Sequence, residues 1–212
     1  MSLALADELF LMAHDLQSGK SRMSDQAMGG GLAAALLAEL VLAGCVEVGP
    51  GGRLGLGEYG PPPENLSEQL YEQTRNRLLG GEISVRDWLA AHGRTAQDAV
   101  ADRLVRNGDL QRETGRRLGR TVVRHRPVKP AEIFMRAQRL SSYLRHRVEV
   151  TEGDVVVARL AQILAPGDAV LELDDAGREY LAQLVPALHP SLLELLSIVE
   201  ASFNSGARGP YF

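Results

Sequence analysis

Residues 29–41 read GGGLAAALLAELV and predict a buried helix. Their apolar side chains recur at three- and four-residue steps, which is the spacing of one helix face: Leu32, Leu36, Leu37, Leu40 and Val41. Gly44 follows at the position where such a helix would stop. The longest apolar run, residues 32–46, contains Glu39 and is shorter than the roughly 20 residues that a membrane-spanning helix needs. We therefore expect a core helix and no membrane span.

Three glycines, Gly29, Gly30 and Gly31, stand where this predicted helix opens. Glycines at a helix start leave backbone N–H groups accessible to an anion, and the helix dipole favours negative charge there. A phosphate-binding loop would continue with Lys-Ser or Lys-Thr, whereas Leu32 and Ala33 follow here. Two interpretations stay open: an anion-binding turn, or a flexible turn that leads into a buried helix.

The segments on both sides of this helix are mostly helical in pattern. Helical spacing is expected over residues 5–13, 64–79, 85–91, 96–107, 131–144, 152–164, 174–184 and 191–203. Ser84 and Thr95 are the expected N-caps of two of these helices, and Gly108 is an expected helix stop.

Two segments have strand-like patterns around a turn. Residues 46–48 and 54–56 flank a Gly-Pro-Gly-Gly turn, and residues 110–112 and 118–124 flank a turn predicted at 113–116. The predicted fold class is therefore mostly α, with two small hairpins.

Length and composition limit the classes of protein. The chain has 212 residues, enough for one ordinary domain or two very small ones. Its one cysteine, Cys45, excludes an internal disulfide and a cysteine-built metal site, and suits a reducing, intracellular setting. The N-terminal segment is amphipathic and carries Asp7 and Glu8, unlike a basic signal sequence. We expect a soluble protein, or one attached to a membrane from one side.

The sequence shows no constellation typical of an enzyme. The five histidines are scattered, without the i, i+4 pairing of a metal-binding helix, and no serine has the flanking glycines of a nucleophile elbow. Cys45 lies in an apolar run and is expected to be a packed small residue. We therefore predict no catalytic residues, no metal and no cofactor.

The charges are strongly segregated along the chain, although the net charge is only -4. Residues 103–147 hold 13 basic residues and three acidic ones, a balance of +10, which leaves -14 on the rest of the chain. Such a basic segment in an acidic protein indicates binding to a polyanion.

The predicted second hairpin concentrates this positive charge. Its basic residues of interest are Arg112, Arg116, Arg117, Arg120 and Arg124. Alternating arginines on a hairpin can form one cationic face, whose paired N–H donors reach phosphate groups. The alternative is a solvated ribbon whose charges pair with the acidic remainder of the chain.

Four segments, in this order, resemble the Golgi phosphoprotein 3 family, in particular its bacterial branch. They are LALADELFL at 3–11, GLAAALLAEL at 31–40, SVRDWL at 84–89 and DRLVRNGDL at 102–110. The resemblance implies a single globular helical domain over residues 1–204 with a protruding β-hairpin, followed by a flexible tail at 205–212. It also implies a non-enzymatic, cytoplasmic adaptor that is peripheral to the membrane, binds phosphatidylinositol 4-phosphate and holds glycosyltransferases by their tails.

The family's headgroup pocket can be carried over residue by residue. Its tryptophan falls near Ser24 and its first arginine on Ala33, while its other two arginines fall on Arg94 and Gln97. Arg94 alone retains the family's residue type, and it is the expected headgroup ligand.

The hairpin tip differs from the apolar tip of the family. Leu118 is its main apolar residue and the expected membrane contact. Burying the neighbouring arginines in hydrocarbon would cost several kcal/mol, whereas each gains ~1 kcal/mol at an anionic surface. The sequence therefore predicts shallow, salt-sensitive adsorption to anionic lipids.

Two other functions compete with lipid binding. Residues 32–56 can be read as a winged helix that binds nucleic acid, although the helix that would enter a groove lacks arginine and asparagine to read bases. The cationic hairpin could instead bind an acidic protein segment, a membrane-enzyme tail or a second copy of the chain.

Overall fold

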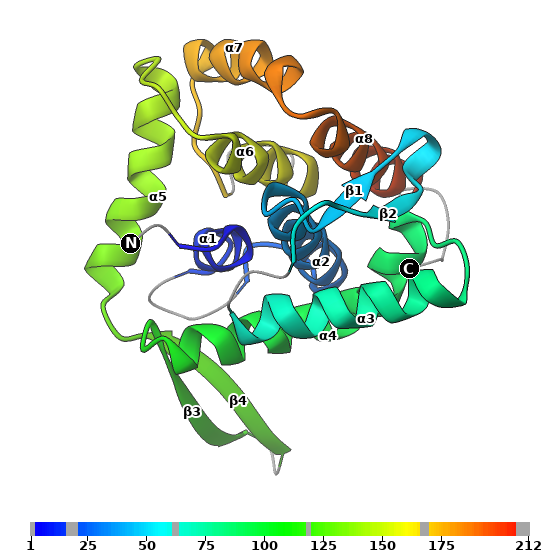
Figure 1. The fold of residues 1–212 in the computed structure, drawn as a ribbon. Helices are drawn as coiled ribbons and strands as arrows, with labels where there is room; N and C mark the ends of the chain where they lie inside the picture. Colours follow the sequence, from blue (N-terminus) through cyan, green and yellow to red (C-terminus); the bar gives the residue numbers. More distant parts are fainter. Residues whose placement is uncertain (1–2, 16–20, 61–63, 118–119, 166–169, 207–212) are drawn as a thin grey trace.

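The core of the protein is a set of helices around one central helix, as the computed structural model shows (Figure 1). The structure describes residues 3–15, 21–60, 64–117, 120–165 and 170–206, with the backbone alone at 115–117, 120–124, 133–134, 136–137 and 205–206. The elements in chain order are α1 (Leu5–Met12), α2 (Asp25–Leu42), β1 (Val46–Val48), the 3-10 turn η1 (Pro50–Gly52), β2 (Leu54–Leu56), α3 (Asn65–Gly80), α4 (Val85–Arg106), β3 (Leu110–Arg117), β4 (Arg120–Pro127), α5 (Pro130–Arg145), α6 (Glu152–Leu164), α7 (Asp175–Leu184), the 3-10 turn η2 (Val185–Ala187) and α8 (Pro190–Gly206).

Helix α2 is the central helix, which confirms the predicted buried helix. Helices α1, α4, α6 and α8 pack around it, and Leu32, Leu37 and Leu40 are fully buried. Among the described residues it is the one helix long and apolar enough to cross a membrane by length and composition, but 67% of it is buried inside the protein. A core helix meets the same two criteria, so this is weak evidence for a membrane span.

The three glycines lie inside α2, so the turn predicted at Gly29, Gly30 and Gly31 is wrong. The helix begins at Asp25, and the Ser24 hydroxyl caps it by accepting a hydrogen bond from the Ala27 N–H. Ser24 is a stronger start signal than the glycines because its side chain satisfies a free N–H group of the first turn.

The glycines are there because neighbouring helices come very close to α2. A Cβ atom on Gly29 would overlap the carbonyl oxygen of Gly93 in α4, and one on Gly31 would overlap a methyl group of Leu164 in α6. A Cβ on Gly30 would lie 2.8 Å from the Phe203 ring of α8. The missing side chains therefore set the distance at which three helices pack on α2.

Helix α4 is continuous, so the predicted break between residues 91 and 96 is wrong. Ser84 caps it in a capping box with Asp87, as predicted for Ser84. Thr95 is not an N-cap; its hydroxyl donates to the His92 carbonyl 3.2 Å away, inside the helix. Gly108 stops the helix with a φ of 78°, as predicted.

Both predicted hairpins are present, but the turn of the second lies later than predicted. Strands β3 and β4 pair antiparallel up to Arg117 and Arg120, and Gly115 pairs with Val122 inside the ladder. The turn predicted at residues 113–116 is therefore wrong, because a glycine in an exposed ribbon can remain in a strand. Figure 1 shows this hairpin projecting from the helical body, which confirms the mostly α fold with a protruding β-hairpin.

The predicted tail begins slightly later than expected. Helix α8 runs to Gly206, so the backbone of the first two tail residues is helical, while residues 207–212 lie outside the described residues.

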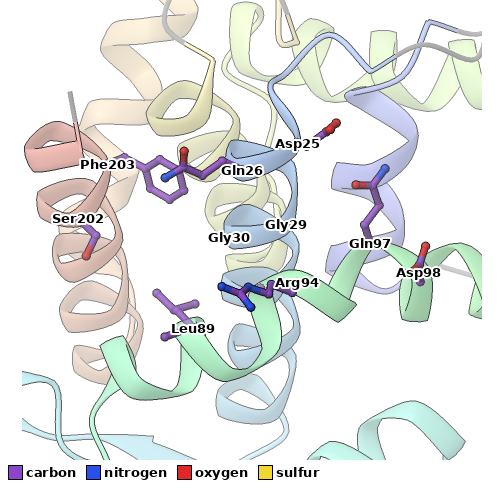
Figure 2. Close-up of a pocket in the computed structure, with 12 residues that line it drawn as sticks. Asp25, Gln26, Gly29, Gly30, Leu89, Arg94, Gln97, Asp98, Ser202 and Phe203 are labelled. Atoms are coloured by element: carbon purple, nitrogen blue, oxygen red, sulfur yellow. The ribbon is translucent and has the colours of Figure 1, made fainter. Parts of the chain in front are cut away.

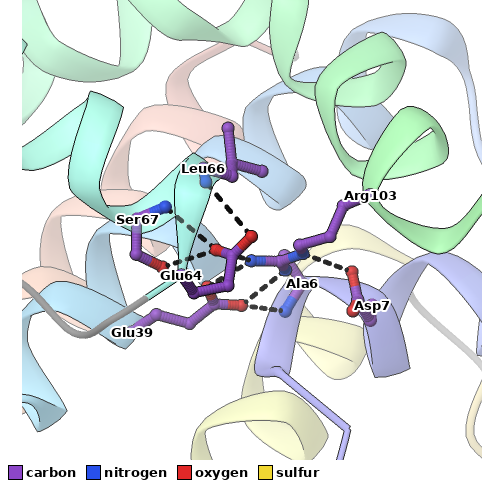
Figure 3. A network of polar contacts seen from close by, with 7 residues as sticks. All are labelled: Ala6, Asp7, Glu39, Glu64, Leu66, Ser67 and Arg103. Carbon is purple, nitrogen blue, oxygen red and sulfur yellow. Dashed lines mark hydrogen bonds and ion pairs between the residues drawn. The ribbon is translucent and has the colours of Figure 1, made fainter. Parts of the chain in front are cut away.

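Arg103 does not belong to the basic surface, although the charge count places it in the basic segment. Its side chain is 2% exposed and is surrounded by three carboxylates (Figure 3). Its Nε donates to Asp7 at 2.8 Å, and its two terminal nitrogens donate to both Glu39 oxygens at 2.9 Å. Glu64 lies 3.5 Å away. The network joins α1, α2 and α4 to the N-terminal end of α3.

Two carboxylates of this network, Asp7 and Glu64, have pKa values shifted in opposite directions. Burial raises the pKa of Asp7 to about 6, against the attraction of Arg103. Burial would also raise the pKa of Glu64, but the Leu66 and Ser67 N–H groups that it caps lower the pKa overall. Asp7 is therefore protonated more readily than Glu64 as the pH falls.

The first prediction concerns Gly29. The substitution Gly29→Ala should lower the free energy of unfolding by about 1–3 kcal/mol, because the new methyl group would push α2 away from α4. Urea unfolding measures the effect. Gly55→Ala is the control, since nothing lies within 4 Å of its added Cβ, and its change should stay within about 0.5 kcal/mol. A Gly29→Ala protein as stable as the wild type would contradict the close crossing.

The second prediction concerns the pH dependence of stability. The pKa of Asp7 is higher in the folded protein, at about 6, than its ordinary value of 3.8. Proton binding to Asp7 stabilises the folded state fully below pH 3.8, and this stabilisation is lost as the pH rises through about 6. Relative to wild type, Asp7→Asn should therefore gain unfolding free energy between pH 4 and pH 7, by about 2–3 kcal/mol.

Urea unfolding at a series of pH values measures this difference. The control Asp175→Asn removes a fully exposed carboxylate and should give a curve parallel to that of the wild type. Parallel curves for Asp7→Asn and the wild type would contradict a raised pKa of Asp7 in the folded protein.

Candidate functional site

A pocket of about 490 Å³ opens between α2, α4 and α8 (Figure 2). Its polar lining comes from the first turn of α2 and the middle of α4, and α8 closes one side with Phe203. The polar side chains on α2 and α4 are Asp25, Gln26, Arg94, Gln97 and Asp98. Leu89 adds a further apolar contact surface.

The close approach of α2 and α4 shapes the base of this pocket. Gly29, Gly30 and Gly93 line it, so bare backbone takes the place of side chains there. The structure thus brings Arg94 together with Gly29 and Gly30, three of the residues that the sequence singles out. Gly31 faces Leu164 and does not line the pocket. Gly29 and Gly30 lie inside α2, so they do not form the open anion-binding turn that the sequence suggested. They allow the Gly93 carbonyl and the Phe203 ring to approach α2 closely.

The charges of the pocket are mixed. Arg94 is exposed, and it forms no ion pair within the described part of the chain. Asp25 and Asp98 are also exposed carboxylates. The pocket therefore offers one guanidinium group, two carboxylates and the amides of Gln26 and Gln97 to a ligand.

Helix α4 links the pocket to the base of the hairpin. Burial lowers the pKa of His125 in β4, and the Arg112 guanidinium lowers it further, whereas Asp98 and Asp102 of α4 act against this change. Asp98 is therefore within electrostatic reach of the hairpin while it lines the pocket. The pocket and the hairpin are carried by the same helix.

The hairpin register distributes the arginines over both faces of the ribbon. Directly opposed residues of an antiparallel pair lie on the same face, and faces alternate along each strand. Positions 112 and 116 fall on one face, and positions 117, 120 and 124 fall on the other. The register therefore contradicts the expectation of one cationic face, because basic positions fall on both faces of the ribbon.

At the hairpin base Leu110 is buried and His125 is half-buried, whereas the described arginines are solvent-exposed. Arg112 is exposed, and Arg126 forms an ion pair with Glu113 at 3.0 Å. For Arg116, Arg117, Arg120 and Arg124 the structure describes the backbone in β3 and β4 but not the side chains, and Leu118 lies outside the described residues. Their contacts with lipid stay predictions.

The positions carried over from the family pocket behave differently. Arg94 and Gln97 line the pocket, and Ser24 directly precedes its residue Asp25. Ala33 is fully buried in the core and does not line it.

Sequence reasoning missed most of the pocket, including Asp25, Asp98 and Phe203. Asp98 lies one helical turn after Arg94, a relation that a continuous α4 would have shown. Asp25 was missed because the helix was expected to start at the glycines, whereas α2 begins at Asp25. Phe203 comes from the other end of the chain, and no local pattern links it to α2.

No group of three or more His, Cys, Asp or Glu side chains that could hold a metal ion occurs within the described ranges. Cys45 is buried, and its thiol donates a hydrogen bond to the Gly60 carbonyl at 2.8 Å.

Comparison with known families assigns the chain. The model of the family described as Golgi phosphoprotein 3 (GPP34) matches residues 5–188, a range that includes α2, α4 and the hairpin. The protein belongs to the Golgi phosphoprotein 3 family, as the four resembling segments indicated. The comparison with curated proteins gives no match.

Proposed function

We propose that the protein is a non-enzymatic, peripheral membrane adaptor that adsorbs to anionic lipid headgroups. The proposal rests on the positive charge of the projecting hairpin. Residues 110–127 contain six arginines and one glutamate, and the ribbon extends away from the helical body (Figure 1). Membership of the Golgi phosphoprotein 3 family supports a general role in lipid binding.

The presence of arginine positions on both faces of the hairpin supports contact with the membrane through the end of the ribbon. A ribbon with positive positions on both faces gains most when it enters the headgroup layer with its end, since each face then meets phosphate groups. Each basic residue at an anionic surface contributes about 1 kcal/mol, whereas an arginine in hydrocarbon costs several kcal/mol. The hairpin should therefore stop among the headgroups.

The pocket supports recognition of a headgroup next to the hairpin. Arg94 is the one basic residue among the described residues that line it. A single guanidinium can bind one phosphate group by paired N–H donors. This favours a general phosphate contact at Arg94 over the specific recognition of phosphatidylinositol 4-phosphate that the family implies.

Nucleic-acid binding by a winged helix is a weaker candidate. The helix that would enter the groove is α2, and it is buried among α1, α4, α6 and α8. Binding of acidic protein segments, membrane-enzyme tails or a second copy through the hairpin remains part of the proposal for an adaptor.

Co-sedimentation with vesicles tests the proposal. The double substitution Arg116→Glu/Arg117→Glu should weaken binding to vesicles rich in phosphatidylglycerol by about 30-fold or more, because two favourable contacts of about 1 kcal/mol become repulsive. The same binding should fall steeply as NaCl is raised, since exposed charges are screened.

The matched control reverses the charge of two arginines near the N-terminal end of α4, one in its first turn and one bridged to its N-cap residue. Arg53 and Arg86 are exposed and lie outside the hairpin, so Arg53→Glu/Arg86→Glu should reduce binding far less. Equal binding to neutral and anionic vesicles, or full binding by the hairpin variant, would refute adsorption through the hairpin.

A further inference from the structure

The charges in the α2–α4–α8 pocket do not suit a multiply charged anion. One guanidinium, that of Arg94, faces the same pocket as the carboxylates of Asp25 and Asp98. A phosphomonoester dianion would gain one attraction and meet two like charges, which disfavours it. A ligand that carries one negative and one positive charge would satisfy both kinds of group.

We propose that this pocket binds a zwitterionic headgroup in which a phosphodiester lies next to a primary ammonium group, the chemistry of phosphatidylethanolamine. The proposal rests on the proposed lipid-binding function and names the ligand class of its pocket. The phosphodiester binds Arg94, and the ammonium group binds at Asp25 and Asp98.

Arg94 is available for the negative end of the ligand. Figure 2 shows its side chain extending toward Leu89 and away from Asp98, and no ion pair joins it to another described residue. The α2 backbone at Gly29 and Gly30 lines the pocket near Arg94, but the Gly93 carbonyl and the Phe203 ring occupy the space next to these two glycines. A phosphodiester has one negative charge, which matches the one guanidinium group.

Asp25 and Asp98 are available for the positive end. Neither forms an ion pair with another described residue, and both lie on the α1 side of Arg94 in Figure 2. Gln97 lies on the same part of α4 and offers an amide oxygen. A primary ammonium group has three N–H donors, enough for two carboxylates and one amide oxygen.

The pocket favours a primary over a quaternary ammonium group. Proteins bind choline-like groups in cages of several aromatic rings. Phe203 is the one aromatic side chain among the described lining residues, and its ring also packs on Gly30. The polar neighbours Gln26 and Gln97 suit N–H donors instead of methyl groups. The volume of about 490 Å³ lies within the ordinary range for small-ligand pockets.

Three soluble probes test the charge pattern without a membrane. They are glycerophosphoethanolamine, glycerophosphoglycerol, which lacks the ammonium group, and glycerophosphocholine, which carries a quaternary one. NMR titration of the full chain should give a Kd for glycerophosphoethanolamine at least fivefold lower than for either of the others. Equal affinities, or no binding of glycerophosphoethanolamine, would overturn the proposal.

Variants assign the two ends of the ligand. Asp25→Asn/Asp98→Asn should reduce the preference for glycerophosphoethanolamine to less than twofold, and Arg94→Gln should weaken binding of all three probes. Asp175→Asn and Arg86→Gln are the controls, because these exposed residues do not line the pocket. A preference that survives in Asp25→Asn/Asp98→Asn would overturn the proposal.

The source of the headgroup is tested separately from adsorption by the hairpin. Vesicles with a constant anionic fraction are compared with phosphatidylethanolamine or phosphatidylcholine as the other lipid. Stronger binding to the ethanolamine vesicles, lost in Arg94→Gln, supports a lipid ligand; no difference, with the soluble preference intact, indicates a free phosphoethanolamine compound and overturns the lipid assignment. Failure of the hairpin proposal would appear instead in Arg116→Glu/Arg117→Glu.

Discussion

The close crossing of α2 and α4 is the constraint on which the rest of the structure depends. At the crossing, Gly29 faces the Gly93 carbonyl, and no side chain larger than hydrogen fits at Gly29. The approach has two consequences. It places the central helix against the helix that carries the hairpin, and it leaves a pocket floored by backbone next to Arg94.

Helix α4 connects the features that we assign to membrane binding. Its middle lines the pocket, its end leads into β3, and its buried Arg103 holds it to α1 and α2. A buried ion pair is weak evidence for stability by itself, but removing one partner of such a pair leaves an uncompensated charge. The Arg103 network therefore holds α4 against α1 and α2, so that the hairpin and the pocket keep a defined relation.

Sequence patterns were sufficient where the cause of a structure is local. The spacing of Leu32 to Val41 predicted the buried helix, and Ser84 predicted the start of α4. They failed where the cause is a neighbour far along the chain. Thr95 resembles an N-cap after a helix break, but α4 continues through the point where the Gly93 carbonyl faces Gly29 of α2. Arg103 resembles a surface charge in the sequence, but Asp7 and Glu39 surround it in the folded protein. The pocket needed Phe203, which no local pattern connects to Arg94.

Photo-crosslinking to lipid tests whether the β3–β4 hairpin contacts the membrane. Anionic vesicles would carry a phospholipid with a photoreactive group at headgroup depth, and the crosslinked peptides of the full chain would be identified by mass spectrometry. We expect crosslinks concentrated in residues 110–127, with a weaker set on the part of α4 that contains Arg94. Crosslinks concentrated on β1–β2 or α7, with the β3–β4 hairpin unlabelled, would contradict this expectation.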